Sequence, residues 1–95
     1  MKITDDLDEA VAIWFWEYVY REERIVERFG QEYGEELLRD VRVINDKFWE
    51  YKPDWTKETL EEAANAAINR IRKEYPDLKR KTLAWMENNF LFSYR

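Results

Sequence analysis

The amino-acid sequence predicts an all-α fold: a small four-helix bundle-like domain with a long N-terminal helix and short connections. Charged residues make up 39% of the 95 residues and apolar residues 45%, with only two glycines and two prolines. Such a mixture, poor in residues that break helices, is typical of helical proteins. Apolar residues also recur at helical spacings of three and four along four separate segments. A chain of this length supports one modest core, so we expect a single domain over residues 1–95.

The first helix is expected to span residues 5–29 without interruption, about seven turns at ~3.6 residues per turn. Thr4 or Asp5 can cap its N-terminus, and Gly30 is a natural C-terminal cap. Five aromatic residues fall within positions 14–20, so their rings point in several directions around the helix. The positions expected to face the core are Leu7, Val11, Trp14, Phe15, Tyr18, Ile25 and Phe29.

A loop and two further helices are expected next. Two glycines bracket residues 30–34, which should form a loop or a short turn. The second helix should cover about 35–51, because Pro53 forces a stop. Thr56 is a candidate cap for the third helix, which should end before Pro76.

The third and fourth helices complete the expected bundle. The alanine-rich segment 63–67 offers small side chains, against which the bulky first helix can pack closely. Asp77 can cap a fourth helix that begins near Leu78. The final segment, 90–94, alternates imperfectly between apolar and polar residues, which leaves a short strand as an alternative to helix there.

The composition excludes several classes of function. The chain has no cysteine and no histidine, so disulfides, thiolate chemistry and imidazole-dependent mechanisms are not available to it. We expect a non-enzymatic protein with no catalytic residues, no metal site and no cofactor. No apolar run approaches the ~18 residues of a membrane span, and the first residues lack a signal-peptide pattern. The expected protein is soluble and cytoplasmic, with no membrane partner.

The net charge of −5 is unevenly distributed. Residues 1–40 carry twelve acidic and five basic side chains, a balance of −7. Residues 41–95 carry nine acidic and eleven basic side chains, a balance of +2. An acidic N-terminal half repels nucleic acid and attracts a basic protein surface, although charged helix faces are also commonly just solvated.

A second face of the first helix is the candidate binding site. Ile13, Trp16 and Tyr20 fall together there, at spacings of three and four. Tryptophan and tyrosine are favoured at binding hot spots because they bury a large area with few rotatable bonds. The alternative is that other helices cover this face and make the first helix central. The expected partner-binding residues are Glu9, Ile13, Trp16, Glu17, Tyr20, Glu23 and Glu27.

These observations favour a protein-interaction domain, specifically a small acidic inhibitor or immunity-type protein that binds a basic partner such as a toxin, a nuclease or a nucleic-acid-binding effector. The alternative is a homo-oligomer whose seam is formed by the same three residues, or by Trp85 and Phe92. Nucleic acid is not an expected partner.

A lesser alternative is a magnesium-dependent hydrolase. Acidic residues of the second helix could face those of the third, as carboxylate ligands of Mg²⁺ do on facing helices. The residues are Glu35, Glu36, Asp40, Glu58, Glu61 and Glu62. This arrangement loosely resembles that of the helical nucleotide pyrophosphohydrolases, and the resemblance implies Mg²⁺ binding at these carboxylates. The lysine-and-carboxylate signature of that family is not matched in detail.

A basic segment lies around the junction of the third and fourth helices. We expect its charges to be solvated or to compensate the acidic first helix, within the chain or across a dimer. Its cationic residues are Arg70, Arg72, Lys73, Lys79, Arg80 and Lys81.

Overall fold

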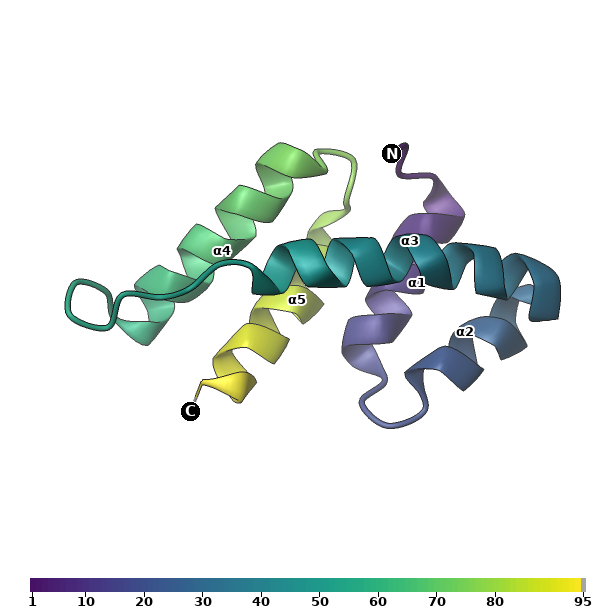
Figure 1. Cartoon of the computed structure of the whole chain (residues 1–95), viewed down its shortest axis with the longest axis horizontal. Helices are drawn as coiled ribbons and strands as arrows, with labels where there is room; N and C mark the ends of the chain where they lie inside the picture. Colours follow the sequence, from purple (N-terminus) through teal and green to yellow (C-terminus); the bar gives the residue numbers. More distant parts are fainter. Residues whose placement is uncertain (95) are drawn as a thin grey trace.

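This computed structural model describes residues 1–94 of the chain. These residues form five α-helices, in place of the expected four (Figure 1). No strand occurs among these residues, so the all-α prediction is confirmed. The radius of gyration is 13.5 Å, which matches a compact chain of this length. The helices are α1 (Asp5–Trp16), α2 (Arg21–Phe29), α3 (Gln31–Trp49), α4 (Leu60–Glu74) and α5 (Arg80–Ser93).

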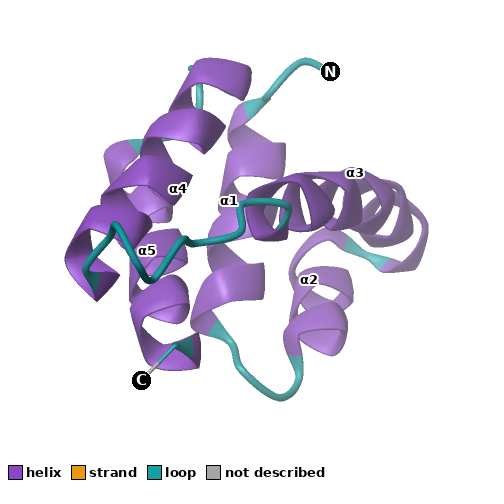
Figure 2. Cartoon of the chain, turned by 60° about the vertical axis from the view of Figure 1, so that its left-hand side comes forward, coloured by secondary structure: helices purple, strands orange, loops and turns teal. Residues whose placement is uncertain are grey.

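Helix α1 is the centre of the arrangement and contacts α2, α3 and α5. Helix α4 packs against α5 and α3 on one side, while α2 folds back beneath α3 on the other (Figure 2). Phe48 of α3 is fully buried, and its ring meets Phe15 of α1 at 5.5 Å and Phe90 of α5 at 6.1 Å between centroids. These edge-on aromatic contacts join the three helices at the core.

The expected continuous helix over residues 5–29 is interrupted, because residues 17–20 leave the helical path between α1 and α2. Glu17 is extended, with φ −91° and ψ 105°. Tyr18, Val19 and Tyr20 all have lower helix propensity than straight-chain residues. The break lets α2 reverse direction and bury Ile25 against α3, whereas an unbroken helix would carry this segment past the core.

The prediction that Tyr18 belongs to the core was therefore wrong. Trp14 and Phe15 are buried as expected, but 62% of the Tyr18 surface remains exposed because the chain turns away after Trp16. The position one turn after Tyr18 on the expected stripe is Glu22, a residue that a core face would not accept.

The expected loop at 30–34 is helical instead. Only Gly30 lies outside the helices, with φ 91° and ψ 161°, a conformation that is essentially restricted to glycine. Gly34 lies inside the first turns of α3, where a Cβ atom would come within 2.9 Å of the Val26 Cα. Gly34 is thus a point of close approach between α2 and α3, and glycine is needed there to let the two backbones meet.

The remaining helix boundaries also shift. Thr59, not Thr56, caps α4: its hydroxyl accepts from the Glu62 N–H at 3.1 Å, and the Glu62 carboxylate accepts from the Thr59 N–H at 2.9 Å. This reciprocal pair is a capping box, and it satisfies two amides at the start of the helix. Helix α4 ends before Pro76, as predicted. The predicted second helix ends two residues early, at Trp49.

Helix α5 begins at Arg80, and not near Leu78 behind an Asp77 cap as expected. The amide of Lys79 donates to the buried carboxylate of Asp8 in α1, at 2.9 Å, which ties the start of α5 to the central helix. The helix continues through Ser93, so the alternative of a final strand was wrong.

The expected packing of the first helix on the alanine-rich segment does not occur. No Cα atoms of α1 and α4 lie within 8 Å of one another, and the buried alanines of α4 lie in the packing with α5 and α3. Because α5 lies between α1 and α4, the small side chains accommodate α5 in place of α1 (Figure 1).

Candidate interaction surface

Exposed aromatic and aliphatic side chains gather where the end of α1, the connection 17–20 and helix α5 meet. Trp16 and Phe92 are each 58% exposed, and Val19 is 70% exposed. Single exposed apolar residues are ordinary on protein surfaces, whereas a contiguous group of them marks an interaction site. We call this group, together with the partly buried Trp85, the aromatic surface; it comprises Trp16, Tyr18, Val19, Tyr20, Trp85 and Phe92.

Two aromatic pairs connect the N-terminal residues of the aromatic surface to its residues on α5. The Trp16 ring meets the Trp85 ring edge to face at 6.2 Å between centroids, and Tyr18 meets Phe92 in the same way at 5.9 Å. In each pair one ring comes from the α1 side and the other from α5. Packing of α1 on α5 thereby joins two apolar segments that lie at opposite ends of the sequence.

The connection 17–20 is fixed by contacts on both sides. The guanidinium of Arg21 lies over the Trp14 ring at 4.7 Å and over the Tyr18 ring at 5.9 Å, in cation–π geometry. The Asn89 side-chain amide of α5 donates to the Phe15 carbonyl, one of the carbonyls left free where α1 ends. The exposed rings therefore project from an anchored segment, which lowers the entropy lost when a partner binds.

A groove of about 370 Å³ opens beside Trp16, between α1 and α5. Ala12, Ile13, Trp16 and Trp85 supply its apolar lining, and Ile13 is partly buried against the core. Such a groove suits one apolar side chain of a partner, flanked by the two indole rings. One charged residue stands on each helix at its edge, Glu9 and Lys81.

Three of the four predicted acidic residues are engaged within the chain. Glu9 pairs with Arg28 at 2.7 Å, while Glu17 and Glu27 each lie 3.6 Å from Arg24. These ion pairs are at least partly exposed to solvent, so each contributes little to stability. They do reduce the negative charge immediately beside Trp16, although they leave the net charge of the protein unchanged.

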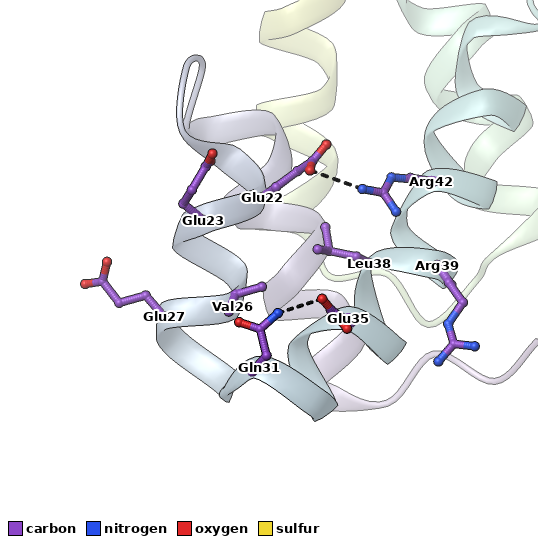
Figure 3. A pocket seen from close by; sticks show the side chains of 9 residues that line it. All are labelled: Glu22, Glu23, Val26, Glu27, Gln31, Glu35, Leu38, Arg39 and Arg42. Atoms are coloured by element: carbon purple, nitrogen blue, oxygen red, sulfur yellow. Dashed lines mark hydrogen bonds and ion pairs between the residues drawn. The ribbon is translucent and has the colours of Figure 1, made fainter.

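The structure divides the predicted site into two surfaces. Ile13, Trp16 and Glu9 share the α1–α5 groove, and Tyr20 lies in the adjoining connection. Glu23 and Glu27 belong instead to a separate groove of about 680 Å³ between α2 and α3 (Figure 3). In Figure 3 both carboxylates project outward from α2, whereas Glu22 reaches across to pair with Arg42 at 3.2 Å.

Sequence reasoning missed Tyr18 and Val19 as surface residues and treated Trp85 and Phe92 as a separate seam. The expectation of one continuous helix placed Tyr18 on the core face of the first helix. The signal that could have revealed them is the run Tyr18-Val19-Tyr20 followed by charged residues from Arg21, which interrupts the apolar stripe.

The candidate metal carboxylates are dispersed. Glu58 accepts from the Tyr51 hydroxyl and from the Asp54 amide, and Glu62 completes the capping box of α4. The Gln31 side-chain amide donates to the Glu35 carboxylate at 2.6 Å in the groove between α2 and α3. Within residues 1–94 no group of three or more acidic side chains is placed to hold a metal ion.

Hydrogen bonds to carboxylates raise the pKa values of two tyrosines. The hydrogen bond to Glu58 raises the pKa of Tyr51 to about 12, since ionisation would lose that bond and place two negative charges together. The hydrogen bond from the Tyr33 hydroxyl to Asp6, 2.8 Å long, raises the pKa of Tyr33 for the same reason. Burial raises the pKa of Tyr75. These tyrosines are neutral at physiological pH and act as hydrogen-bond donors or packing groups.

The basic segment is only partly compensated. Arg70 pairs with Glu50 at 2.9 Å and Lys79 with Asp5 of α1 at 3.4 Å. Arg72 and Arg80 form no ion pair with any residue in the described range 1–94.

Comparison with known proteins returned no matching family model, no matching curated protein and no matching solved structure. None of the helices within residues 1–94 combines the length and the apolar character required to span a bilayer.

Proposed function

We propose that this chain is a protein-interaction domain that binds a partner protein through the aromatic surface. The observation that supports this most is the pair of exposed edge-to-face contacts, Trp16 with Trp85 and Tyr18 with Phe92. A monomer gains little from leaving Trp16, Tyr18 and Phe92 more than half exposed. A partner that covers them gains about 25 cal/mol for each Å² of apolar surface removed from water.

The partner proposed is a basic protein, and the chain acts as its small inhibitor or immunity-type antagonist. The net charge of −5 supports this, because long-range attraction depends on net charge and raises the rate of encounter with a positively charged surface. Ion pairs within the chain do not change its net charge, so the long-range attraction is retained. The aromatic surface then provides the short-range contacts that slow dissociation.

The role is proposed to be non-enzymatic and cytoplasmic. Protein–protein contact requires none of the thiol or imidazole chemistry that the composition lacks, and a chain without cysteine suits a reducing compartment. The aromatic surface presents a large apolar area on side chains with few rotatable bonds, and its tyrosine and tryptophan residues add polar groups. These are the properties of a binding surface.

The test is affinity capture from the native cell with three immobilised proteins: wild type, Trp16→Ala and Trp55→Ala. Trp55 is the matched control, because it is 50% exposed, lies in the α3–α4 connection, and its ring meets Tyr94 and not a ring of the aromatic surface. We expect a protein that is retained by wild type and Trp55→Ala and lost from Trp16→Ala. Equal retention by all three proteins would refute the proposal.

Self-association is the second candidate, and one observation favours it. The two seams considered separately from the sequence were one at Ile13, Trp16 and Tyr20 and one at Trp85 and Phe92. They adjoin through the contact of Trp16 with Trp85, so a second copy could cover both. Sedimentation velocity over a range of concentrations separates the candidates. A dimer that Trp16→Ala dissociates supports self-association, and a wild-type monomer at millimolar concentration rules it out.

A further inference from the structure

The groove between α4 and α5 is a second concave feature, separate from the aromatic surface. Its volume is about 440 Å³. Buried apolar side chains form its floor, since Ile68, Leu78 and Leu83 are at most 7% exposed. Exposed arginines stand on both walls: Arg72 near the end of α4 and Arg80 at the start of α5.

These two arginines differ from most others in the chain. Arg24, Arg28, Arg42 and Arg70 all form ion pairs with glutamates. Within residues 1–94 no carboxylate lies in ion-pair distance of Arg72 or Arg80, although the protein carries an excess of acidic residues. The positive charge at this groove is therefore available to an external carboxylate.

The charges are ordered along the groove. Arg72 and Arg80 flank the turn that joins α4 to α5. Glu87 lines the same groove two turns further along α5, which is about 10 Å away at the rise of an α-helix. One end of the groove is thus basic and the other acidic, so an elongated ligand with carboxylates at one end would bind in one direction.

We propose that the α4–α5 groove binds an acidic amphipathic helix of a partner protein, with apolar side chains on the floor and carboxylates on Arg72 and Arg80. A guanidinium matches a carboxylate with two parallel hydrogen bonds, which fixes position as well as charge. A small free anion would contact the arginines and leave Pro76 and Ala84, the exposed apolar residues of the lining, uncovered. An uncharged helix would cover these two residues but desolvate two arginines without a partner, which costs free energy.

This site and the aromatic surface lie on different faces of α5. Ala84 and Glu87 point into the α4–α5 groove, whereas Lys81 and Trp85 line the groove with α1. The domain can therefore bind an acidic segment at one face while its aromatic surface is occupied at another. The proposal does not depend on the function proposed above.

The test uses fluorescence anisotropy with two labelled peptides of about 15 residues, long enough for a marginal isolated helix. One carries leucines on one helical face with glutamates beside them at one end, and the second replaces each glutamate by lysine. We expect the glutamate peptide to bind about tenfold or more tightly than the lysine peptide, with an affinity that falls as salt is raised. Failure of the glutamate peptide to bind, or equal binding of both peptides, overturns the proposal.

Four variants locate the site. Arg72→Glu and Arg80→Glu should each weaken binding of the glutamate peptide by about tenfold, the effect of losing one charge-assisted pair. Arg39→Glu makes the same charge change in the α2–α3 groove and should leave binding near the wild-type value. Trp16→Ala should also leave it unchanged. Equal loss in all three charge-reversal variants would indicate general attraction and contradict a site at this groove. All three arginines are exposed, and circular dichroism checks that each variant is folded.

Discussion

Trp16 at the end of α1 meets Trp85 of α5 edge to face, with the ring centroids 6.2 Å apart, while 58% of the Trp16 surface stays exposed. At this contact the buried core of the protein borders the candidate interface. Phe15, the preceding residue, is buried against Phe48, so adjacent aromatic residues have opposite roles.

Trp16→Ala should therefore leave the protein folded. We expect it to lower the free energy of unfolding by about 1 kcal/mol or less, the value of one exposed aromatic pair. Phe15→Ala should lower it by about 3–5 kcal/mol, because it opens a cavity in the core. Urea denaturation measures both. A loss for Trp16→Ala comparable with that for Phe15→Ala would make Trp16 a core residue and remove the basis of the proposed interface.

Asn45 should be a principal polar residue of the fold. Its side-chain oxygen accepts from the Trp14 indole N–H and from the Trp49 indole N–H, each at 3.1 Å, and so links α1 to α3. Asn45→Ala leaves two part-buried donors without this partner, and we expect a loss of about 1–3 kcal/mol in thermal or urea unfolding. Asn88→Ala, at an exposed position of α5, is the control and should change stability by less than about 0.5 kcal/mol.

Gly34→Ala tests the close approach of α2 and α3. Alanine at an ordinary helix position is more stable than glycine by about 1 kcal/mol. Here the new Cβ would lie 2.9 Å from the Val26 Cα, a backbone atom that cannot rotate away. We expect a net destabilisation of about 1–3 kcal/mol in urea unfolding. Asn69→Ala, on the exposed side of α4, should be neutral or slightly stabilising. A Gly34→Ala protein more stable than wild type would show that α2 is free to move.

Tyr51 should ionise at a higher pH than an ordinary tyrosine. Its pKa is raised to about 12 by the hydrogen bond to Glu58, from the usual value of about 10. The neutral form is favoured by folding, so this contact stabilises the protein below pH 10 and the stabilisation is lost as pH rises from 10 to 12. Tyrosinate absorbance gives the titration, and Glu58→Gln should shift the Tyr51 step toward 10. If Tyr51→Phe removes a step near 10, the contact is absent in solution.

The sequence predicts the helical class and most helix positions because apolar spacing and the proline stop at Pro76 act locally. It does not predict the break at residues 17–20, since that break depends on Asn89 and Arg21 and on the burial of Ile25 against a distant helix. Gly34 was misread for a related reason. A glycine that permits close approach of two helices has the same local signal as one in a loop.

The candidate site was only partly predictable for the same physical reason. Trp16 and Tyr20 can be singled out from spacing within one segment. The partnership of Trp16 with Trp85, and of Tyr18 with Phe92, depends on how α1 crosses α5, which no local pattern specifies. The predicted acidic border is only partly present at Trp16: Glu9 lines the same groove, whereas Glu23 and Glu27 lie on α2 in a separate groove.

Photo-crosslinking in the native cell tests the central claim, that the aromatic surface binds a partner protein, most directly. Benzoylphenylalanine is introduced in place of Phe92, in the aromatic surface, or in place of Tyr33, an exposed aromatic residue of α3 far from it in the fold. We predict a discrete adduct of higher mass from position 92 that is absent from position 33 and that Trp16→Ala abolishes. Position 92 yielding no adduct, or the same adducts as position 33, would contradict the account.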